Sequence, residues 1–369
     1  MKQRPVPILF TLPNLITAGS GRALFEIASR LDRSRFAPHL CLAKRGGALE
    51  RLFEDADIPV LEGQVTAPCA PRLSLPVRAR RAARRLDVPR GALWHSFHYL
   101  DDYSEPLIAR FAGARAWIFT KKNMSWNDRS WQLRTLGATR VVAQNQDMLR
   151  DFFPGRWRRR TRLVPRGVDT RRFRPADQPK HNSILTVGCV AHLVPVKGHP
   201  TLLEAVARRP NLRLLIAGRE LDADYGRELD AQIERLDRVH PGFAERVKKL
   251  GAVDDVPSLL QQLDIFVLPT WARWRMEGSP VALLEAMSSG LPVIATDIPG
   301  SRDLVESGRS GLLVPPEDAQ ALAAALERLE SADERRRLGA AARERVLDRF
   351  SIEREVADHE AIYAEVGGL

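Results

Sequence analysis

The sequence predicts an α/β protein of two domains, each built on a parallel sheet covered by helices. The chain has 369 residues, which is long for one hydrophobic core and typical of two domains. Short apolar runs of the strand type alternate with amphipathic segments of the helix type, a pattern that favours parallel sheets. A polar stretch at 163–183, punctuated by Pro165, Pro175 and Pro179, separates two such series.

The first series predicts a domain over residues 1–175. We expect strands at 6–12, 39–43, 93–97, 116–120 and 140–143, and helices at 22–31, 49–55 and 78–85. A loop of small residues lies between the first strand and the first helix, and its Gly19 would let the backbone approach a ligand closely. The alternative is that this loop serves tight packing only.

The second series predicts a domain over residues 176–351. We expect strands at 184–187, 212–217, 249–250, 265–268, 292–296 and 311–314, and helices at 201–207, 226–239, 318–330 and 334–348. A last helix over residues 352–369 is expected to return toward the first domain. Two such sheets in series leave a cleft between the carboxyl ends of their strands, and a ligand is expected there.

One helix of the second domain follows the turn Glu277-Gly278-Ser279-Pro280. Ser279 is expected to be the N-cap and Pro280 the first helical residue. The backbone N–H groups at such a helix end bind anions, and Glu277 and Glu285 can accept hydrogen bonds from hydroxyls. Two interpretations of this segment stay open: a ligand site, or a capped core helix with two incidental glutamates.

The cysteines and the apolar runs limit the cellular setting. Cys41, Cys69 and Cys189 are far apart and odd in number, which argues against a disulfide framework or a zinc site and predicts a reducing cytoplasm. No apolar run approaches the ~20 residues needed to span a bilayer. The apolar start of the chain is short and interrupted by prolines, so it is expected to be a buried strand and not a signal peptide.

The positive charge is concentrated in the first domain. The whole chain carries +11, with 57 Lys+Arg and 46 Asp+Glu. Residues 1–175 hold 33 basic and 15 acidic residues, a balance of +18, which leaves 24 against 31, or −7, for the rest. Two dense arms, 78–85 and 156–160, favour an anionic partner: a membrane surface, a phosphorylated acceptor or nucleic acid. The alternative is solvated arginine on helix faces.

Residues 277–296 contain Glu-Gly-Ser-Pro, then Leu-Leu-Glu-Ala-Met and Gly-Leu-Pro-Val-Ile-Ala-Thr. This segment resembles the EGxP…LLEAMxxGxPVIAT signature of the retaining GT-B glycosyltransferases of family 4, also called group 1, in which Glu277 and Glu285 would be the paired glutamates. Further segments resemble family motifs in the family's order: 164–175, 197–205, 217–218, 250–251, 264–269 and 308–315. The resemblance is near-complete from residue 163 onward and patchy before it. It implies a GT-B fold, two Rossmann-like domains with parallel sheets facing across a cleft.

The resemblance also implies a reaction and a donor site. The expected reaction is metal-independent transfer of a hexose or related sugar, with retention, from a nucleotide diphosphate; a UDP-sugar is favoured, and a GDP- or ADP-sugar is possible. Lys197 and the amides near Gly278, Ser279, Pro280 and Val281 would stabilise the leaving diphosphate. Glu285 would bind the ribose, Glu277 would contact the transferred sugar, and Gly218 would belong to the donor site.

Some positions depart from the family pattern. The family's arginine before the lysine is His192 here, so either a histidinium replaces it or another arginine reaches in. Gly19 is kept in the first-domain loop. The family's HxH strand end reads His95-Ser96-Phe97, with His98 one place later. Which of the two histidines faces the cleft stays open; a packed histidine is the alternative for each.

The segment after the strand at 116–120 is the expected acceptor site. Lys121, Lys122, Asn123 and Trp126 suit an anionic glycan or a lipid-linked, lipopolysaccharide-like acceptor, and a solvated loop with one packed tryptophan is the alternative. The expected location is the cytoplasm, peripheral at the inner face of the plasma membrane. Competing readings are a GT-B sugar-nucleotide epimerase, a non-catalytic nucleotide-sugar binder and a nucleic-acid binder, of which the last is not expected.

Overall fold

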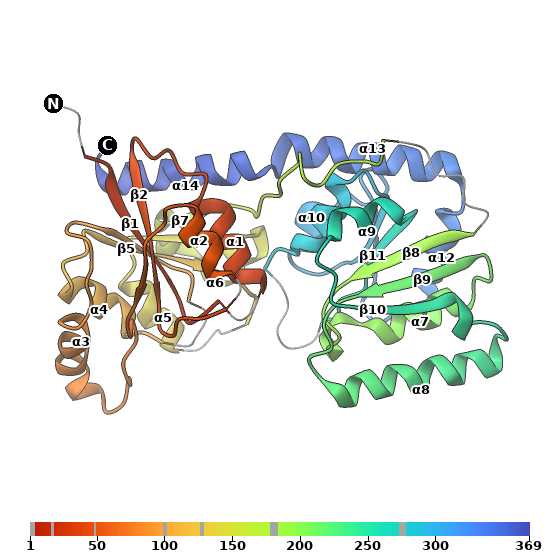
Figure 1. Ribbon diagram of the computed structural model, residues 1–369, viewed down its shortest axis with the longest axis horizontal. Helices are drawn as coiled ribbons and strands as arrows, with labels where there is room; N and C mark the ends of the chain where they lie inside the picture. Colours follow the sequence, from red (N-terminus) through yellow and green to blue (C-terminus); the bar gives the residue numbers. More distant parts are fainter. Residues whose placement is uncertain are drawn as a thin grey trace. The chain divides into compact units, whose positions relative to one another are not determined.

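The computed structural model describes residues 4–15, 18–47, 49–98, 102–125, 129–177, 184–272 and 278–369. The chain divides into two compact units, each with its own parallel sheet (Figure 1). Unit 1 contains the described residues of Met1–Lys122, Trp126–Pro165 and Ile352–Leu369. Unit 2 contains those of Asn123–Ser125 and Arg166–Ser351. The predicted α/β class with two parallel sheets is confirmed.

Unit 1 is built on a seven-stranded parallel sheet in the order β3-β2-β1-β4-β5-β6-β7. Its strands are β1 Val6–Leu12, β2 Phe36–Leu42, β3 Val60–Glu62, β4 Leu93–Ser96, β5 Ala116–Lys121, β6 Arg140–Ala143 and β7 Thr161–Leu163. Its helices are α1 Ala18–Ala28, α2 Glu50–Asp55, α3 Leu75–Ala83, α4 Glu105–Phe111, α5 Arg129–Leu136, α6 Gln146–Phe152 and α14 Ile352–Gly367.

The two faces of this sheet have different cores. On one face, side chains of α1, α2 and α14 pack on alternate residues of the strands, such as Ile8 and Phe10. On the other face, rings from β5, α5 and the end of α6 contact one another, including Phe119 and Trp131 at 5.0 Å between centroids. The last helix therefore belongs to the core of unit 1, although it follows all of unit 2 in the sequence.

Unit 2 is built on a six-stranded parallel sheet in the order β10-β9-β8-β11-β12-β13. Its strands are β8 Leu185–Val190, β9 Leu212–Ala217, β10 Val247–Gly251, β11 Ile265–Leu268, β12 Val293–Thr296 and β13 Leu312–Val314. The order runs outward from β8 in one direction and from β11 in the other. The switch point, where ligands bind in sheets of this kind, therefore lies between β8 and β11.

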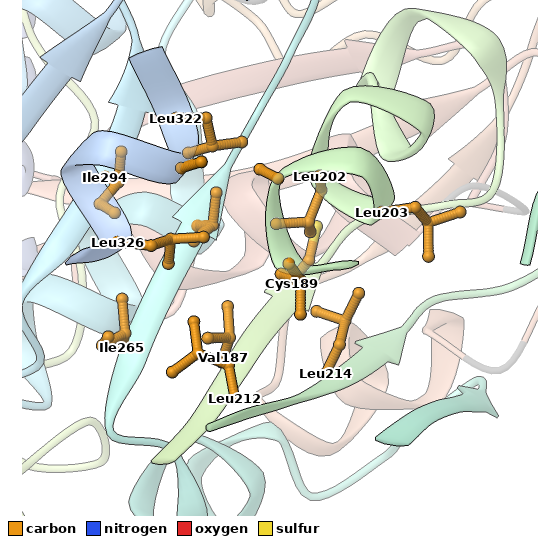
Figure 2. Packing of buried hydrophobic residues seen from close by; sticks show 14 of the residues in the cluster. Val187, Cys189, Leu202, Leu203, Leu212, Leu214, Ile265, Ile294, Leu322 and Leu326 are labelled. Atoms are coloured by element: carbon orange, nitrogen blue, oxygen red, sulfur yellow. The ribbon is translucent and has the colours of Figure 1, made fainter. Parts of the chain in front are cut away.

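Helices cover both faces of the second sheet. They are α7 His199–Ala207, α8 Ala223–Val239, α9 Val256–Gln262, α10 Val281–Ser288, α11 Ser301–Leu304, α12 Ala319–Arg328 and α13 Ala332–Arg349. Leucines of α7 and α12 pack against Val187, Leu214 and Ile294 of the strands (Figure 2). On the opposite face, α9, α10 and α13 form a second apolar cluster with Phe266 and Val293. Within the described residues, none of the helices combines the length and apolar composition needed to cross a bilayer.

The structure differs from the sequence prediction in some elements. The short strands β3 and β7 and the short helices α4, α5, α6 and α9 were not expected. The predicted cap of α10 is wrong, because Pro280 has ψ 104° and is itself the N-cap, so that the helix begins at Val281 and not at Pro280. Elsewhere the expected strands and long helices occur, with ends shifted by a few residues.

Candidate functional site

The loops at the switch point of unit 2 are held together by close backbone contacts. The loop after β8 includes the short 3-10 turn η3, Pro195–Lys197, which ends at Gly198 with φ 69°. A Cβ at Gly198 would lie 1.9 Å from the carbonyl oxygen of Pro269, the first residue after β11. Trp271 N also donates to Val196 O at 2.9 Å. Lys197 is thereby fixed beside the end of β11.

The loop after β9 lies against the same loop. A Cβ at Gly218 would lie 1.9 Å from Ala191 O, and Leu193 N donates to Arg219 O at 3.0 Å. His192, between these contacts, is exposed. Arg219 is also exposed and has no ion pair within the described residues. The structure thus places an arginine next to the position where the resemblance led us to expect one.

Helix α10 follows β11 in the chain. Among the described residues, no side chain caps its first turn. Its buried residues Leu283, Leu284, Ala286 and Met287 fix it to the sheet, as expected for a partly core helix. Glu285 lies between them and is half-buried. An uncapped helix end leaves backbone N–H groups for a ligand. Gly278 is buried; the predicted sugar contact, Glu277, lies outside the described residues.

Two hydroxyls that flank positions 273–277 in the sequence are buried, and neither has a hydrogen-bond partner among the described residues. Thr270, which follows β11, is 1% exposed, and its Oγ1 is unsatisfied. Ser279 Oγ, next to the start of α10, is unsatisfied as well. A buried polar group without a partner costs about 1–3 kcal/mol, so a ligand that forms a hydrogen bond with such a group gains free energy. Sequence reasoning missed Thr270; its place directly after a strand and Pro269 was the available signal.

His199 begins α7 behind the same loop. Its Nδ1 lies 3.3 Å from the Tyr225 hydroxyl, and within the described part of the chain its Nε2 has no hydrogen-bond partner. Burial, and then the positive charge of Lys197, lower the pKa of His199 to about 4. His199 is therefore neutral at pH 7 and adds no charge beside Lys197.

In unit 1, His95 is a fully enclosed residue of β4. Its Nδ1 pairs with Tyr363 Oη of α14 at 2.7 Å, and its Nε2 pairs with Thr120 Oγ1 at 2.9 Å. Burial, followed by the charges of His359 and Lys122, holds its pKa well below the usual range. Both ring nitrogens are thus engaged by protein atoms.

His98 lies on the other side of the same strand end, near a buried carboxylate. Glu105 accepts hydrogen bonds from Thr11, Trp94 and Ser96 and from Arg134, whose Nη2 is 2.9 Å away. Burial acts to raise the pKa of Glu105, but Arg134 and these partners hold it below its usual value. Burial lowers the pKa of His98. Sequence reasoning missed Glu105 and Arg134.

The predicted acceptor residues have different environments. Lys121 ends β5 and is 3% exposed, with Nζ 3.9 Å from the ring centroid of Phe152 and 4.2 Å from that of Trp131. Burial lowers its pKa to about 7. An acceptor contact by Lys121 would need the ammonium to leave these rings. Lys122 and Asn123 are half-buried; Trp126 lies outside the described residues.

The remaining predicted positions carry less information. Gly19 is exposed in α1, with open space where a Cβ would project. The sequence Asp222-Ala223-Asp224 is no metal site in this structure's described part, since Asp222 caps α8 by accepting hydrogen bonds from the amides of Asp224 and Tyr225. Among the described residues, no three His, Cys, Asp or Glu side chains are grouped to hold a metal ion.

Comparison with known proteins was made for sequence and for structure. Residues 182–331 match the family model described as "Glycosyl transferases group 1". The lipopolysaccharide core biosynthesis mannosyltransferase LpsB of Rhizobium meliloti is 31% identical over 219 residues, covering 54% of this chain and 60% of LpsB. Escherichia coli WcaL, whose name describes a colanic acid biosynthesis glycosyltransferase, is 32% identical over 287 residues, covering 74% and 65%. The chain thus spans less than two thirds of these relatives.

The fold extends over the whole chain. Anabaena Alr3699/HepE, solved in complex with UDP, superposes with a TM-score of 0.79 and covers 99% of this chain and all of that one, at 23% identity. At this identity the likeness shows the fold alone, and the predicted GT-B class is confirmed.

Proposed function

Residues 182–331 belong to the group 1 glycosyltransferase family, and from this premise we propose that the chain is a glycosyltransferase of lipopolysaccharide or polysaccharide biosynthesis. The observation that carries the proposal is the start of α10, which has no side-chain cap among the described residues and which follows, in the chain, the buried and unsatisfied hydroxyls of Thr270 and Ser279. This arrangement suits an anion that also bears hydroxyls, as a nucleotide-diphosphate sugar does. The names of LpsB and WcaL support a surface glycan as the acceptor.

We assign the donor site to unit 2. Lys197 and the first amides of α10 stabilise the diphosphate as the glycosidic bond breaks, without a metal ion. Glu285 binds the ribose and Glu277 the transferred sugar. Arg219, with His192, provides positive charge near the diphosphate. A UDP-sugar is the favoured donor, since the structural neighbour is complexed with UDP.

We assign the acceptor to unit 1. We assign the ligand contact to His98, which follows the carboxyl end of β4, where ligands bind in sheets of this kind; His95 lies within the strand and both of its nitrogens have protein partners. Lys122 and Trp126, together with Asn123 of the segment between them, are the residues we assign to binding an anionic, lipid-linked or lipopolysaccharide-like acceptor. Transfer proceeds with retention, and the enzyme works in the cytoplasm at the inner face of the plasma membrane.

The test is transfer and donor binding with purified protein. UDP-, GDP- and ADP-sugars are screened by thermal shift, and products with and without a lipopolysaccharide-type acceptor are identified by mass spectrometry. Lys197→Ala and Glu277→Ala are expected to lower kcat at least a hundredfold, whereas Lys248→Ala and Glu234→Ala, at exposed positions, leave it unchanged. Unchanged transfer by the first pair would refute the site. An altered sugar nucleotide formed without acceptor would instead indicate an epimerase.

A further inference from the structure

The basic arm of unit 1 forms a defined surface on α3 and on the 3-10 turn η1, Arg72–Ser74, that precedes it. Residues 72–86 contain six arginines and no acidic residue. Leu75, Ala79 and Ala83 are buried at a spacing of four, so one side of α3 faces the protein, where it packs beside α4 (Figure 1). The opposite side is directed to solvent.

That solvent side combines charge with exposed apolar side chains. Leu73 is 99% exposed and Val77 is 65% exposed. Arg80 and Arg81 of α3 are exposed on the same outer side as Val77, and Arg84 and Arg85, directly after the helix, are exposed as well. Arg78 points elsewhere: its guanidinium donates to Pro68 O at 2.9 Å and to Pro71 O at 2.8 Å. These hydrogen bonds connect α3 to the segment that precedes η1.

The four outer arginines, Arg80, Arg81, Arg84 and Arg85, differ from other exposed arginines in their contacts within the protein. Across the part of the chain that the structure describes, none of them has an ion pair or a side-chain hydrogen bond. The exposed arginines of α13 behave differently, since Arg336 and Arg337 pair with Asp333 and Glu334 one turn earlier. The α3 arginines are therefore available to an external anion.

We propose that η1 and the outer face of α3 dock this protein onto an anionic lipid bilayer. Leu73 and Val77 enter the interfacial region, while Arg80, Arg81 and Arg84 contact lipid phosphates. A nucleic acid fits less well, because the face presents no aromatic ring for base stacking and its most exposed side chain is a leucine. The proposal concerns attachment only and does not depend on the transferase assignment.

The experiment is flotation of the full chain with phosphatidylcholine vesicles that contain, or lack, phosphatidylglycerol. Arg81→Gln/Arg84→Gln should weaken binding to the anionic vesicles about twenty-fivefold, at about fivefold per arginine. The matched control, Arg235→Gln/Arg238→Gln, removes two exposed arginines from α8 and should bind as the wild type does. An equal loss in both pairs would mean a general charge effect and would overturn the proposal.

A second pair of variants tests the apolar contact. Leu73→Gln/Val77→Gln should weaken binding severalfold at any salt concentration, and Leu221→Gln/Val239→Gln, also at exposed positions, should not. All four variants change exposed side chains, and unchanged thermal unfolding will confirm that they fold. No binding of wild type to anionic vesicles, or its release by duplex DNA at equal phosphate concentration, would also overturn the proposal. Binding of UDP should be the same in every variant, so a failed transferase assignment is recognised separately.

Discussion

Arg134 and Glu105 form a buried ion pair, with Nη2 of the arginine 2.9 Å from Oε2 of the glutamate and the two side chains 3% and 0% exposed. The same carboxylate accepts hydrogen bonds from Thr11 of β1 and Ser96 of β4. The pair therefore joins α4 and α5 to the carboxyl ends of two strands. The predicted contact residue His98 lies near this ion pair.

Removing one partner of this pair should lower the free energy of unfolding. We expect Arg134→Met to lower the free energy of unfolding by about 3–5 kcal/mol, because Glu105 would keep a buried charge without its cation. Urea unfolding measures the loss. The double variant Arg134→Met/Glu105→Gln should recover part of it, since neither charge remains. A single variant within about 1 kcal/mol of wild type would contradict this account.

The depressed pKa of Glu105 gives the pair a pH dependence. A carboxyl group that ionises more readily in the folded state contributes stability above its ordinary pKa and loses it as the pH falls through the folded value. We expect the stability difference between wild type and Glu105→Gln to shrink below about pH 4.5. Unfolding at stepped pH values checks this, and a difference that stays constant into acid would refute it.

Lys121 should destabilise the folded protein at neutral pH. Its pKa falls from 10.5 to about 7 on folding, mainly through burial. Between these two values the unfolded chain holds the proton and the folded chain does not, so stability rises with pH across that interval. Below about pH 7 both states are charged and the whole cost is present. We expect Lys121→Met to gain roughly 2–4 kcal/mol at pH 7 and little at pH 10.5.

The measurement for Lys121 is the unfolding free energy of both proteins at pH 7 and about pH 10.5. The two rings around Nζ offset part of the cost, since a cation over an aromatic face is stabilised. Lys122→Met, one residue later on a half-buried side chain, is the control and should show a smaller gain. A Lys121→Met variant less stable than wild type at both pH values would show that the stabilisation of the cation by the two rings exceeds the cost of burying it.

The sequence predicted the sheets well because buried parallel strands are short apolar runs that stand out from their surroundings. It did not predict α4, α5 and α6, since helices of seven or eight residues carry too few turns for a clear period. The cap of α10 was assigned wrongly because a Ser-Pro pair fits two starting points. Only the backbone angles of Pro280 decide between them.

The environment of Lys121 could have been predicted, and that of Glu105 could not. In β5, Trp117, Phe119 and Lys121 alternate onto one face, so the strand period already placed the lysine among aromatic rings. Glu105 and Arg134 are 29 positions apart and belong to two short helices. No local pattern connects them, and they meet only because the sheet brings α4 and α5 together.

The contact between His95 and Tyr363 should stabilise the packing of α14 on the sheet of unit 1. The hydroxyl of Tyr363 lies 2.7 Å from Nδ1 of a fully buried ring, so Tyr363→Phe leaves that nitrogen without a partner. We expect a loss of about 1–3 kcal/mol in the free energy of unfolding. Tyr225→Phe is the matched control, because its hydroxyl lies 3.3 Å from Nδ1 of His199, a weaker bond. An equal loss in both would contradict the ranking.

Gly198 should be required both for folding and for the donor site, and Gly251 provides the comparison. The two glycines have nearly the same backbone angle, φ 69° and φ 67°, so an alanine suffers similar backbone strain at either position. A Cβ at Gly251 meets open space, whereas one at Gly198 would lie 1.9 Å from Pro269 O. We expect Gly251→Ala to lower the free energy of unfolding by about 1 kcal/mol and Gly198→Ala by about 3 kcal/mol or more, since the backbone around Gly198 must move apart.

That movement separates Lys197 from the end of β11, so UDP should no longer raise the melting temperature of Gly198→Ala, while it still does so for Gly251→Ala. Equal costs and equal UDP shifts in the two variants would show that the close approach at Pro269 does not organise the site.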